Sequence, residues 1–294
     1  MQIKPLFAVA LSCLMLAGCN TTKTEKDGEP SLKSSYAPGA DEHRRLKAND
    51  PVKMEPTAWI KPGSPARVGS IFSSGGLAGR TLSVGSISDI QLADKELILT
   101  FDDGPMPGKT EQILDVLDRF QVKASFMMVG QMARSHPEIA RDVVRRGHSI
   151  GSHTFSHRNL AALNFETAMA EIDKGQHAVS DAVDAPVGFF RFPYLADTRK
   201  IRSALANRGT VVMDVNIDSK DYFKSSPNAV LERTMAVIHH QRKGIILMHD
   251  IHARTVSMLP LLLSRLEDEG YKVVTLRYRR SRTPEGGLFA SNDH

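Results

Sequence analysis

The feature that most constrains the fold is a regular alternation of short apolar runs with longer amphipathic segments, between about residues 94 and 278. The run 97–101 (LILTF) is uninterrupted and ends in two acidic residues, as is typical of a strand buried in a parallel sheet. The segment 110–120 then repeats apolar residues at helical spacing, with Ile113, Leu114 and Leu117 on one face. Strand, helix, strand predicts a βα unit.

The same unit recurs along the chain. Further strands are predicted at 124–129, 149–150, 189–191, 211–215, 244–248 and 271–276, and further helices at 137–146, 165–183, 199–208, 227–239 and 256–268. Gly147 and Gly209 follow two of these helices as stop signals. About six to seven repeats in one domain, residues 94–278, predict an α/β fold that closes as a barrel.

The amino-terminal residues have the pattern of an export signal. Lys4 precedes an apolar run over 6–16, which is too short to span a bilayer comfortably, and the run ends in LAGC at 16–19. Small residues before a Cys resemble the lipobox of bacterial lipoproteins, which implies cleavage before Cys19 and its attachment to a membrane by acylation. An ordinary cleaved signal with an incidental Cys is the alternative. By the same resemblance, Asn20 after Cys19 favours the outer membrane, facing the periplasm, in a Gram-negative cell.

The stretch that follows, residues 20–93, predicts a tether or loosely ordered arm. It is rich in Lys, Glu, Ser, Gly and Pro and has no sustained apolar period, as in KPGSP at 61–65 and SSGG at 73–76. Short apolar pieces near Trp59 and Ile71 leave open that part of it packs on the domain. Residues 279–294 are predicted to be a carboxyl-terminal tail. Of the two Cys residues, Cys13 lies in the signal, so the mature chain has no pair for an internal disulfide.

The charge of the chain does not indicate a nucleic-acid partner. The formal net charge is +5, from 38 Lys and Arg against 33 Asp and Glu, but the basic residues are scattered and no aromatic-rich RNA-binding signature accompanies them. The charge is therefore interpreted as a solvated surface. Anionic glycans or lipid headgroups are left as long-range partners.

Ionisable and aromatic residues fall where the predicted strands end. They are Asp102 and Asp103, then His153 and His157, Arg191 to Tyr194, Asp218 to Tyr222, and His249 with Asp250. Each group alone has an ordinary structural explanation, such as a turn, a helix cap or an ion pair. In a βα barrel, however, the carboxyl ends of the strands converge on one face, where catalytic groups gather. The pattern therefore predicts one cleft.

Taken in order, these residues resemble the NodB-type polysaccharide deacetylases, carbohydrate esterase family four. The motifs that carry the resemblance are TFDDG at 100–104, HTFSH at 153–157, RFPY at 191–194, DSKDY at 218–222 and LMH at 247–249. They span essentially the whole predicted domain. The resemblance implies a distorted (β/α) barrel of about seven repeats and a divalent metal, most often Zn²⁺, with Co²⁺ or Ni²⁺ as alternatives.

The resemblance also implies a role for each matched residue. Asp103, His153 and His157 would be the metal ligands, which leaves coordination positions for water and substrate, as a catalytic metal requires. Asp102 would be the general base and His249 the general acid that protonates the leaving amine.

The other matched residues would support that pair. Arg191 would orient Asp102, and Asp221 would orient His249. The backbone N–H of Tyr194 would stabilise the oxyanion, and Tyr222 and Leu247 would wall a pocket for the acetyl methyl group.

Two positions depart from the family pattern. Tyr222 stands where many relatives have Trp, which puts the shape of the pocket in doubt, and Leu195 follows Tyr194 where many relatives have Gly.

The activity implied is removal of N-acetyl groups from an acetylated amino-sugar polymer of the bacterial envelope. The same scaffold would also serve an O-acetyl esterase, and a catalytically weak glycan-binding lipoprotein is an alternative of another class. The sequence does not choose among peptidoglycan, poly-N-acetylglucosamine and chitin-like polymers.

Overall fold

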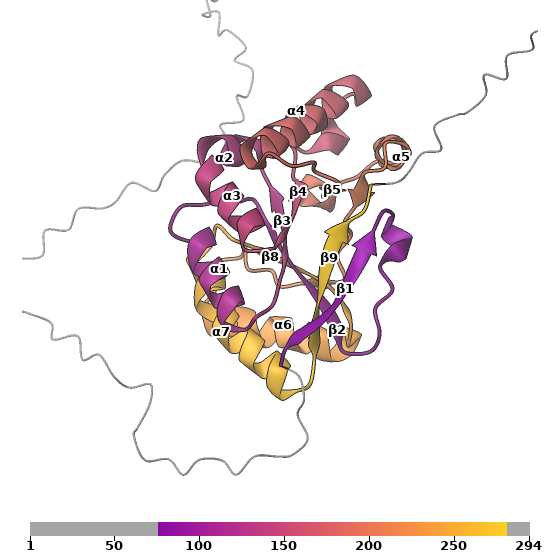
Figure 1. The fold of residues 1–294 in the computed structure, drawn as a ribbon. Helices are drawn as coiled ribbons and strands as arrows, with labels where there is room; N and C mark the ends of the chain where they lie inside the picture. The colour runs from indigo at the N-terminus through magenta and orange to yellow at the C-terminus, as the bar shows by residue number, and fades with distance from the viewer. Residues whose placement is uncertain (1–75, 281–294) are drawn as a thin grey trace, which may run out of the picture. The chain divides into compact units, whose positions relative to one another are not determined.

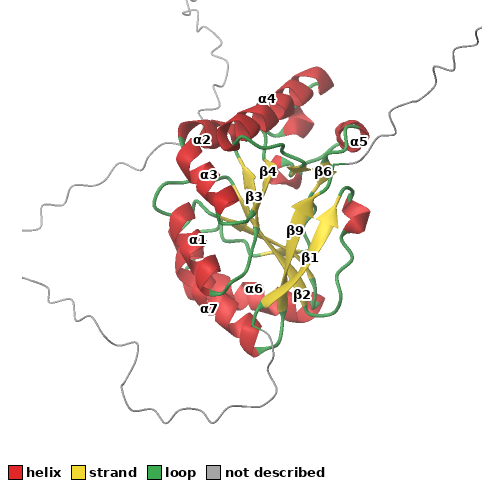
Figure 2. Ribbon diagram, viewed as in Figure 1, coloured by secondary structure: helices red, strands yellow, loops and turns green. Residues whose placement is uncertain are grey.

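The computed structural model describes residues 76–280 as a parallel sheet with helices packed around it (Figures 1 and 2). The strands are β1 (Ala78–Val84), β2 (Glu96–Asp102), β3 (Ser125–Met128), β4 (Ser149–Ser152), β5 (Phe189–Phe190), β6 (Val211–Val212), β7 (Ile217–Asp218), β8 (Gly244–His249) and β9 (Lys272–Tyr278). The helices are α1 (Thr110–Arg119), α2 (Gly130–Ser135), α3 (Pro137–Arg145), α4 (Phe165–Val183), α5 (Arg199–Asn207), α6 (Pro227–Gln241) and α7 (Ala253–Asp268). Short 3₁₀ turns lie at Ile87–Asp89, Leu160–Ala162 and Pro193–Leu195.

The ladder of strands follows most of a barrel. From β2 it runs through β3, β4 and β5 to β6 on one side and through β8 to β7 on the other, with every pair parallel. Within residues 76–280, no ladder joins β6 to β7. The parallel α/β fold predicted from the sequence is confirmed, and the predicted barrel is interrupted at this seam.

The prediction of a loosely ordered arm up to residue 93 is wrong for its last part. Residues 78–84 form β1, which pairs in parallel with β9, and both Leu77 and Val84 are buried. Because β1 is an edge strand with most of its residues at least partly exposed, it carries no strong apolar period, and its partner lies about 190 residues later.

Several predicted segments lie outside the described residues. These are the signal with Cys19, residues 20–75 of the arm, and residues 281–294 of the tail. Among the helices of residues 76–280, none is long and apolar enough to cross a bilayer.

The helices begin and end close to where the sequence places them, for local reasons. The α4 helix matches its predicted bounds, and the Asn164 side chain caps it by accepting a hydrogen bond from the backbone N–H of Thr167. Pro227 opens α6 and Pro137 opens α3, since proline suits the first helical turn. The sequence did not reveal α2 and β7, which contain only six and two residues.

Alternate residues of strand β2 point into two different hydrophobic clusters. Leu97, Leu99 and Phe101 face the helices in the larger cluster, whereas Ile98 faces a second cluster inside the curved sheet. By the same alternation, Thr100 and Asp102 share the inner side with Ile98. The strand therefore delivers one of the two adjacent carboxylates to the interior of the sheet.

Candidate active site

Asp102 and Asp103 lie at the carboxyl end of β2 and take different environments. Asp102 is the last residue of the strand and is buried, with its side chain on the inner face. Asp103 has a left-handed backbone conformation, φ 79°, which breaks the alternation and turns its carboxylate to another side. Strained backbone at a cluster of polar side chains is a common mark of a functional site.

Arg191 holds the Asp102 carboxylate from inside the sheet. Arg191 is the largest of the fully buried side chains in residues 76–280. Its Nη1 donates hydrogen bonds to Asp102 Oδ1 at 2.6 Å and to Thr100 Oγ1 at 2.7 Å, and its Nε donates to the carbonyl oxygen of Met213 at 3.1 Å. Burial raises the pKa of Asp102, and the nearby guanidinium opposes that rise. The carboxylate is thus fixed in orientation and made more basic than an exposed Asp.

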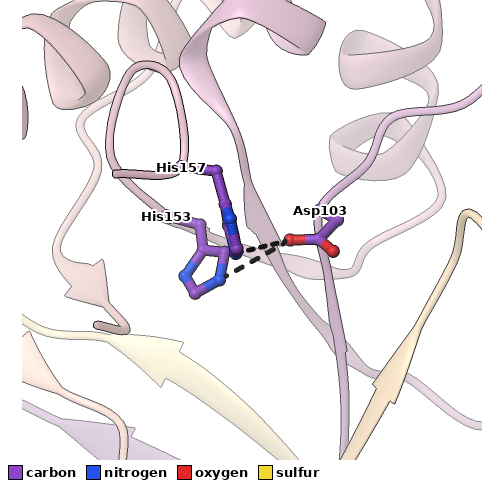
Figure 3. Close-up of side chains that lie close together, drawn as sticks. All are labelled: Asp103, His153 and His157. Carbon is purple, nitrogen blue, oxygen red and sulfur yellow. Dashed lines mark ion pairs between the residues drawn. The ribbon is translucent and has the colours of Figure 1, made fainter. Parts of the chain in front are cut away.

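Asp103, His153 and His157 form a candidate metal centre (Figure 3). Their ligand atoms all lie within 4.8 Å of one another. Asp103 Oδ1 is 3.6 Å from His153 Nε2 and 3.3 Å from His157 Nε2. This buried oxygen has no hydrogen-bond partner, a costly state that a bound cation would relieve. One carboxylate and two imidazoles are ligand types that Zn²⁺ accepts, so the residues fit a divalent ion.

Neighbouring groups fix the orientation and the protonation state of His153 that metal binding needs. Its Nδ1 is 2.8 Å from the carbonyl oxygen of Arg191, which leaves Nε2 directed at Asp103. Burial lowers the pKa of His153 to about 3, so its imidazole is neutral near pH 7, as metal binding requires. Asp102 Oδ2 is also within 3.8 Å of this nitrogen, but Asp102 is already held by Arg191.

The loop that carries both histidines is clamped between two helices. Thr154 and His157 have left-handed φ values of 66° and 58°. At the start of α2, the backbone N–H of Gly130 donates to the Thr154 carbonyl at 2.9 Å. From α4, Gly175 packs so closely that a Cβ there would lie 2.4 Å from the Thr154 carbonyl carbon. A side chain on α4 at this position would displace the loop.

His249 and Asp221 form a second charged pair in the same cleft. The His249 Nδ1 is 2.6 Å from Asp221 Oδ1, and the backbone N–H of His249 donates to Asp221 Oδ2 at 2.8 Å. Thr255 also donates to Oδ2, at 2.6 Å. Burial by itself lowers the pKa of His249, but the hydrogen bond and charge of Asp221, together with the charges of Asp103 and Asp102, outweigh it and raise the pKa to about 9. This imidazole is therefore a proton donor near pH 7.

The carboxylates, histidines and three predicted pocket residues line one cavity of about 370 Å³. Tyr194 contributes from the turn after β5, with its ring 4.7 Å from that of His157. Tyr222 contributes from the loop after β7, with its ring 5.6 Å from that of His249, and Leu247 comes from β8. The volume falls at the lower end of small-ligand pockets. The structure therefore brings all the predicted site residues to one cleft, with Arg191 and Asp221 packed behind its lining.

Two residues that were predicted at strand ends, but were assigned no role, also support the cleft. The Asp250 carboxylate is buried against the segment that follows Asp103. A Cβ on Gly104 would lie 2.0 Å from it, and Thr110 Oγ1 donates a hydrogen bond to it at 2.7 Å. Burial raises the pKa of Asp250 to about 7. Asp218 accepts a hydrogen bond from the Tyr222 hydroxyl at 2.9 Å and so fixes one wall of the pocket. Both stand inside or beside the recognised motifs, but their partners come from distant segments.

The fold and the cleft define the class: a parallel α/β domain with a candidate metal centre at the carboxyl ends of its strands. Comparison with known proteins specifies it further. The profile of the polysaccharide deacetylase family matches residues 89–213, which include Asp102 to Tyr194 and stop before Asp221 and His249. The chitooligosaccharide deacetylase of Sinorhizobium fredii is 30% identical over 193 residues, covering 60% of this chain and 88% of that protein. The chain belongs to the polysaccharide deacetylase family, and its domain is of the NodB type.

Two further relatives are bacterial peptidoglycan deacetylases. The peptidoglycan-N-acetylglucosamine deacetylase of Listeria monocytogenes is 31% identical over 183 residues, which are 62% of this chain but only 38% of that protein. The solved structure of a peptidoglycan deacetylase of Bdellovibrio bacteriovorus has 33% sequence identity and a TM-score of 0.60, over 70% of this chain and 58% of that one. The likeness is therefore to the deacetylase domain of these proteins.

Proposed function

We propose that this chain is a metal-dependent hydrolase that removes N-acetyl groups from an amino-sugar polysaccharide of the bacterial envelope and releases acetate. The observation that carries the proposal is the unpartnered, buried Asp103 oxygen facing two imidazoles, beside the Asp102 carboxylate that Arg191 holds. A charged His249 lines the same cavity. Together these are the parts that hydrolysis of an amide needs.

Asp103, His153 and His157 would hold the metal, with Zn²⁺ favoured by the donor set and Co²⁺ or Ni²⁺ as alternatives. A bound ion supplies Lewis-acid polarisation of the acetamide carbonyl and lowers the pKa of water. All other steps fall to side chains and one backbone N–H of the protein itself.

In the proposed reaction, Asp102 accepts a proton from the water whose oxygen forms the new bond to the acetamide carbon. The backbone N–H of Tyr194 would donate a hydrogen bond to the oxyanion that develops. His249 gives its proton to the nitrogen as the C–N bond breaks, because without that proton the nitrogen would have to leave as a strongly basic amide anion. The products are acetate and a free amino sugar. Arg191 and Asp221 act only by holding Asp102 and His249.

Tyr222 and Leu247 would enclose the methyl of the acetyl group. The Tyr222 hydroxyl is held by Asp218, and Leu247 lines the cavity and is almost fully buried. Because the relatives above are named as deacetylases of peptidoglycan and of chitooligosaccharides, an acetylated amino-sugar polymer is the substrate class that we propose.

Metal analysis and acetate release on the same preparation test this function. We expect about one divalent ion per chain and acetate release from an N-acetylglucosamine oligomer that stops on chelation and returns with Zn²⁺. Side-by-side rates on peptidoglycan, poly-N-acetylglucosamine, chitin oligomers and acetylated xylan would identify the polymer and separate N- from O-deacetylation. Full activity in a strong chelator, or no hydrolysis of any of these, would refute the proposal.

We also propose that the chain is exported and anchored in the envelope through a lipid on Cys19. The support is the LAGC sequence at 16–19 after a short apolar run. Cys19→Ser should leave an uncleaved or soluble form, read by membrane fractionation and by the mass of the chain. Normal processing and membrane recovery of Cys19→Ser would contradict the anchor without bearing on the deacetylase activity.

A further inference from the structure

Exposed apolar side chains of the domain gather at the mouth of the catalytic cleft. In residues 76–280 the large exposed hydrophobic residues are Ile87, Tyr194, Leu195, Tyr222, Phe223 and Leu261. Tyr194, Leu195 and Tyr222 line the cavity, and the ring of Phe223 lies 4.7 Å from that of Tyr222. A cluster of exposed apolar side chains around a pocket usually marks a binding surface.

Phe223 is the member of this cluster that neither lines the cavity nor takes part in the proposed reaction. It is 56% exposed and does not line the cavity, so it extends the aromatic wall outward from Tyr222. Nothing in the fold requires an apolar ring there, because the ring gains little burial. Exposing a Phe in water is unfavourable, which suggests that another molecule covers it.

The backbone beneath Phe223 is held rigidly by two arginines from different helices. Arg233 of α6 donates hydrogen bonds to the carbonyls of Ser219 and Lys220, at 3.0 and 2.9 Å. Arg254 of α7 donates to the carbonyls of Asp221 and Phe223, at 2.7 and 3.3 Å. A ring on a fixed loop loses little conformational entropy when a ligand covers it. The clamp therefore presents Phe223 as a preorganised surface.

We propose that Phe223 is a stacking platform for a sugar ring of the polysaccharide next to the one whose acetyl group enters the cavity. The proposal rests on the proposed function. A cavity of about 370 Å³ is too small for more than one end of a polymer, so the rest of the chain lies outside it, and Tyr222 and Phe223 offer one apolar side of the rim for contact. The C–H groups of a pyranose face are slightly positive and suit the negative face of an aromatic ring. Phe223 is thus a determinant of chain-length preference.

The test compares long and minimal substrates on the full chain loaded with Zn²⁺. Phe223→Ala should raise KM for the N-acetylglucosamine hexamer by roughly three- to tenfold, on the scale of one aromatic contact, with kcat nearly unchanged. The KM for para-nitrophenyl acetate, which reaches only the cavity, should not move. Phe223→Tyr should restore the hexamer KM. Leu261→Ala is the matched control, since Leu261 is 49% exposed on α7 and lies away from the cavity lining.

An unchanged hexamer KM in Phe223→Ala, or an equal rise for the small ester, would overturn the platform. Calorimetric binding of the hexamer to Asp102→Asn, with and without Phe223→Ala, separates this result from the proposed function. If the wild-type chain releases no acetate but Phe223→Ala still weakens binding, the platform stands and the deacetylase proposal fails. Equal affinity of the two variants, or no binding to either, overturns the platform whatever the turnover.

Discussion

The pair of Asp221 and His249 makes a sharp prediction about the pH dependence of turnover. In the proposed reaction His249 must be protonated to act as the acid, so turnover is present below the pKa of His249 and is lost as the pH rises through it. With Asp221 in place, that pKa is raised to about 9. Asp221→Asn keeps the size of the side chain and an oxygen for hydrogen bonding but removes the negative charge. The pKa of His249 should then fall toward its ordinary value of 6.5, because burial lowers it and only the charges of Asp103 and Asp102 still raise it.

The magnitude follows from the fraction of protonated imidazole. At pH 8, a group with a pKa of about 9 is mostly protonated, whereas one of 6.5 is protonated in only a few molecules per hundred, so Asp221→Asn should lose roughly thirtyfold in kcat/KM. At pH 5.5 both imidazoles are protonated and the two enzymes should differ little. The measurement is acetate release across this range. Both proteins carry the same metal, so any effect of the ion on the pKa of His249 is the same in both.

Thr255→Val is the matched control. It removes the hydrogen bond of 2.6 Å to Asp221 Oδ2 but leaves the charge of Asp221, so the alkaline limb of its profile should stay near that of the wild type. If the alkaline limb of Asp221→Asn also stays in place, the charge of Asp221 does not set the protonation of His249. If Asp221→Asn loses the same factor at every pH, its role is to position the ring, and the electrostatic reasoning is refuted.

Further predictions separate the other residues of the cleft. Asp103→Ala should lower metal affinity because it removes one of three ligands, whereas Asp102→Asn should keep the metal and lose about 10²–10⁴ in rate that added metal does not restore; the reverse pattern in metal analysis would exchange the two roles. His249→Ala should keep its metal and lose rate as Asp102→Asn does, so metal loss in this variant would contradict its assignment as the acid. Gly175→Ala should lower the free energy of unfolding by about 1–3 kcal/mol and weaken metal binding, since the new methyl would push on the Thr154 backbone; thermal denaturation and metal titration read both, and an unchanged melting temperature and metal affinity would show that the loop has room.

The sequence by itself determined the class of fold and the set of residues in the cleft. Uninterrupted apolar runs such as 97–101 leave few alternatives to buried parallel strands, and amphipathic helices with clear start and stop residues separate them. The helix bounds of α4 were predictable because its cap and its periodicity are local. The order of the five motifs was sufficient to indicate the family.

Only the tertiary structure decided how these side chains are placed. The family resemblance implied different roles for Asp102 and Asp103 without a physical reason. In the structure, strand alternation and a left-handed φ send one carboxylate to Arg191 and the other to the histidines. The pairing of β1 with β9, the burial of Asp250 against Gly104 and the exposure of Phe223 each depend on segments that are distant along the chain. Local patterns carry no record of such contacts, because the hydrogen bonds and packing that create them exist only after the chain has folded.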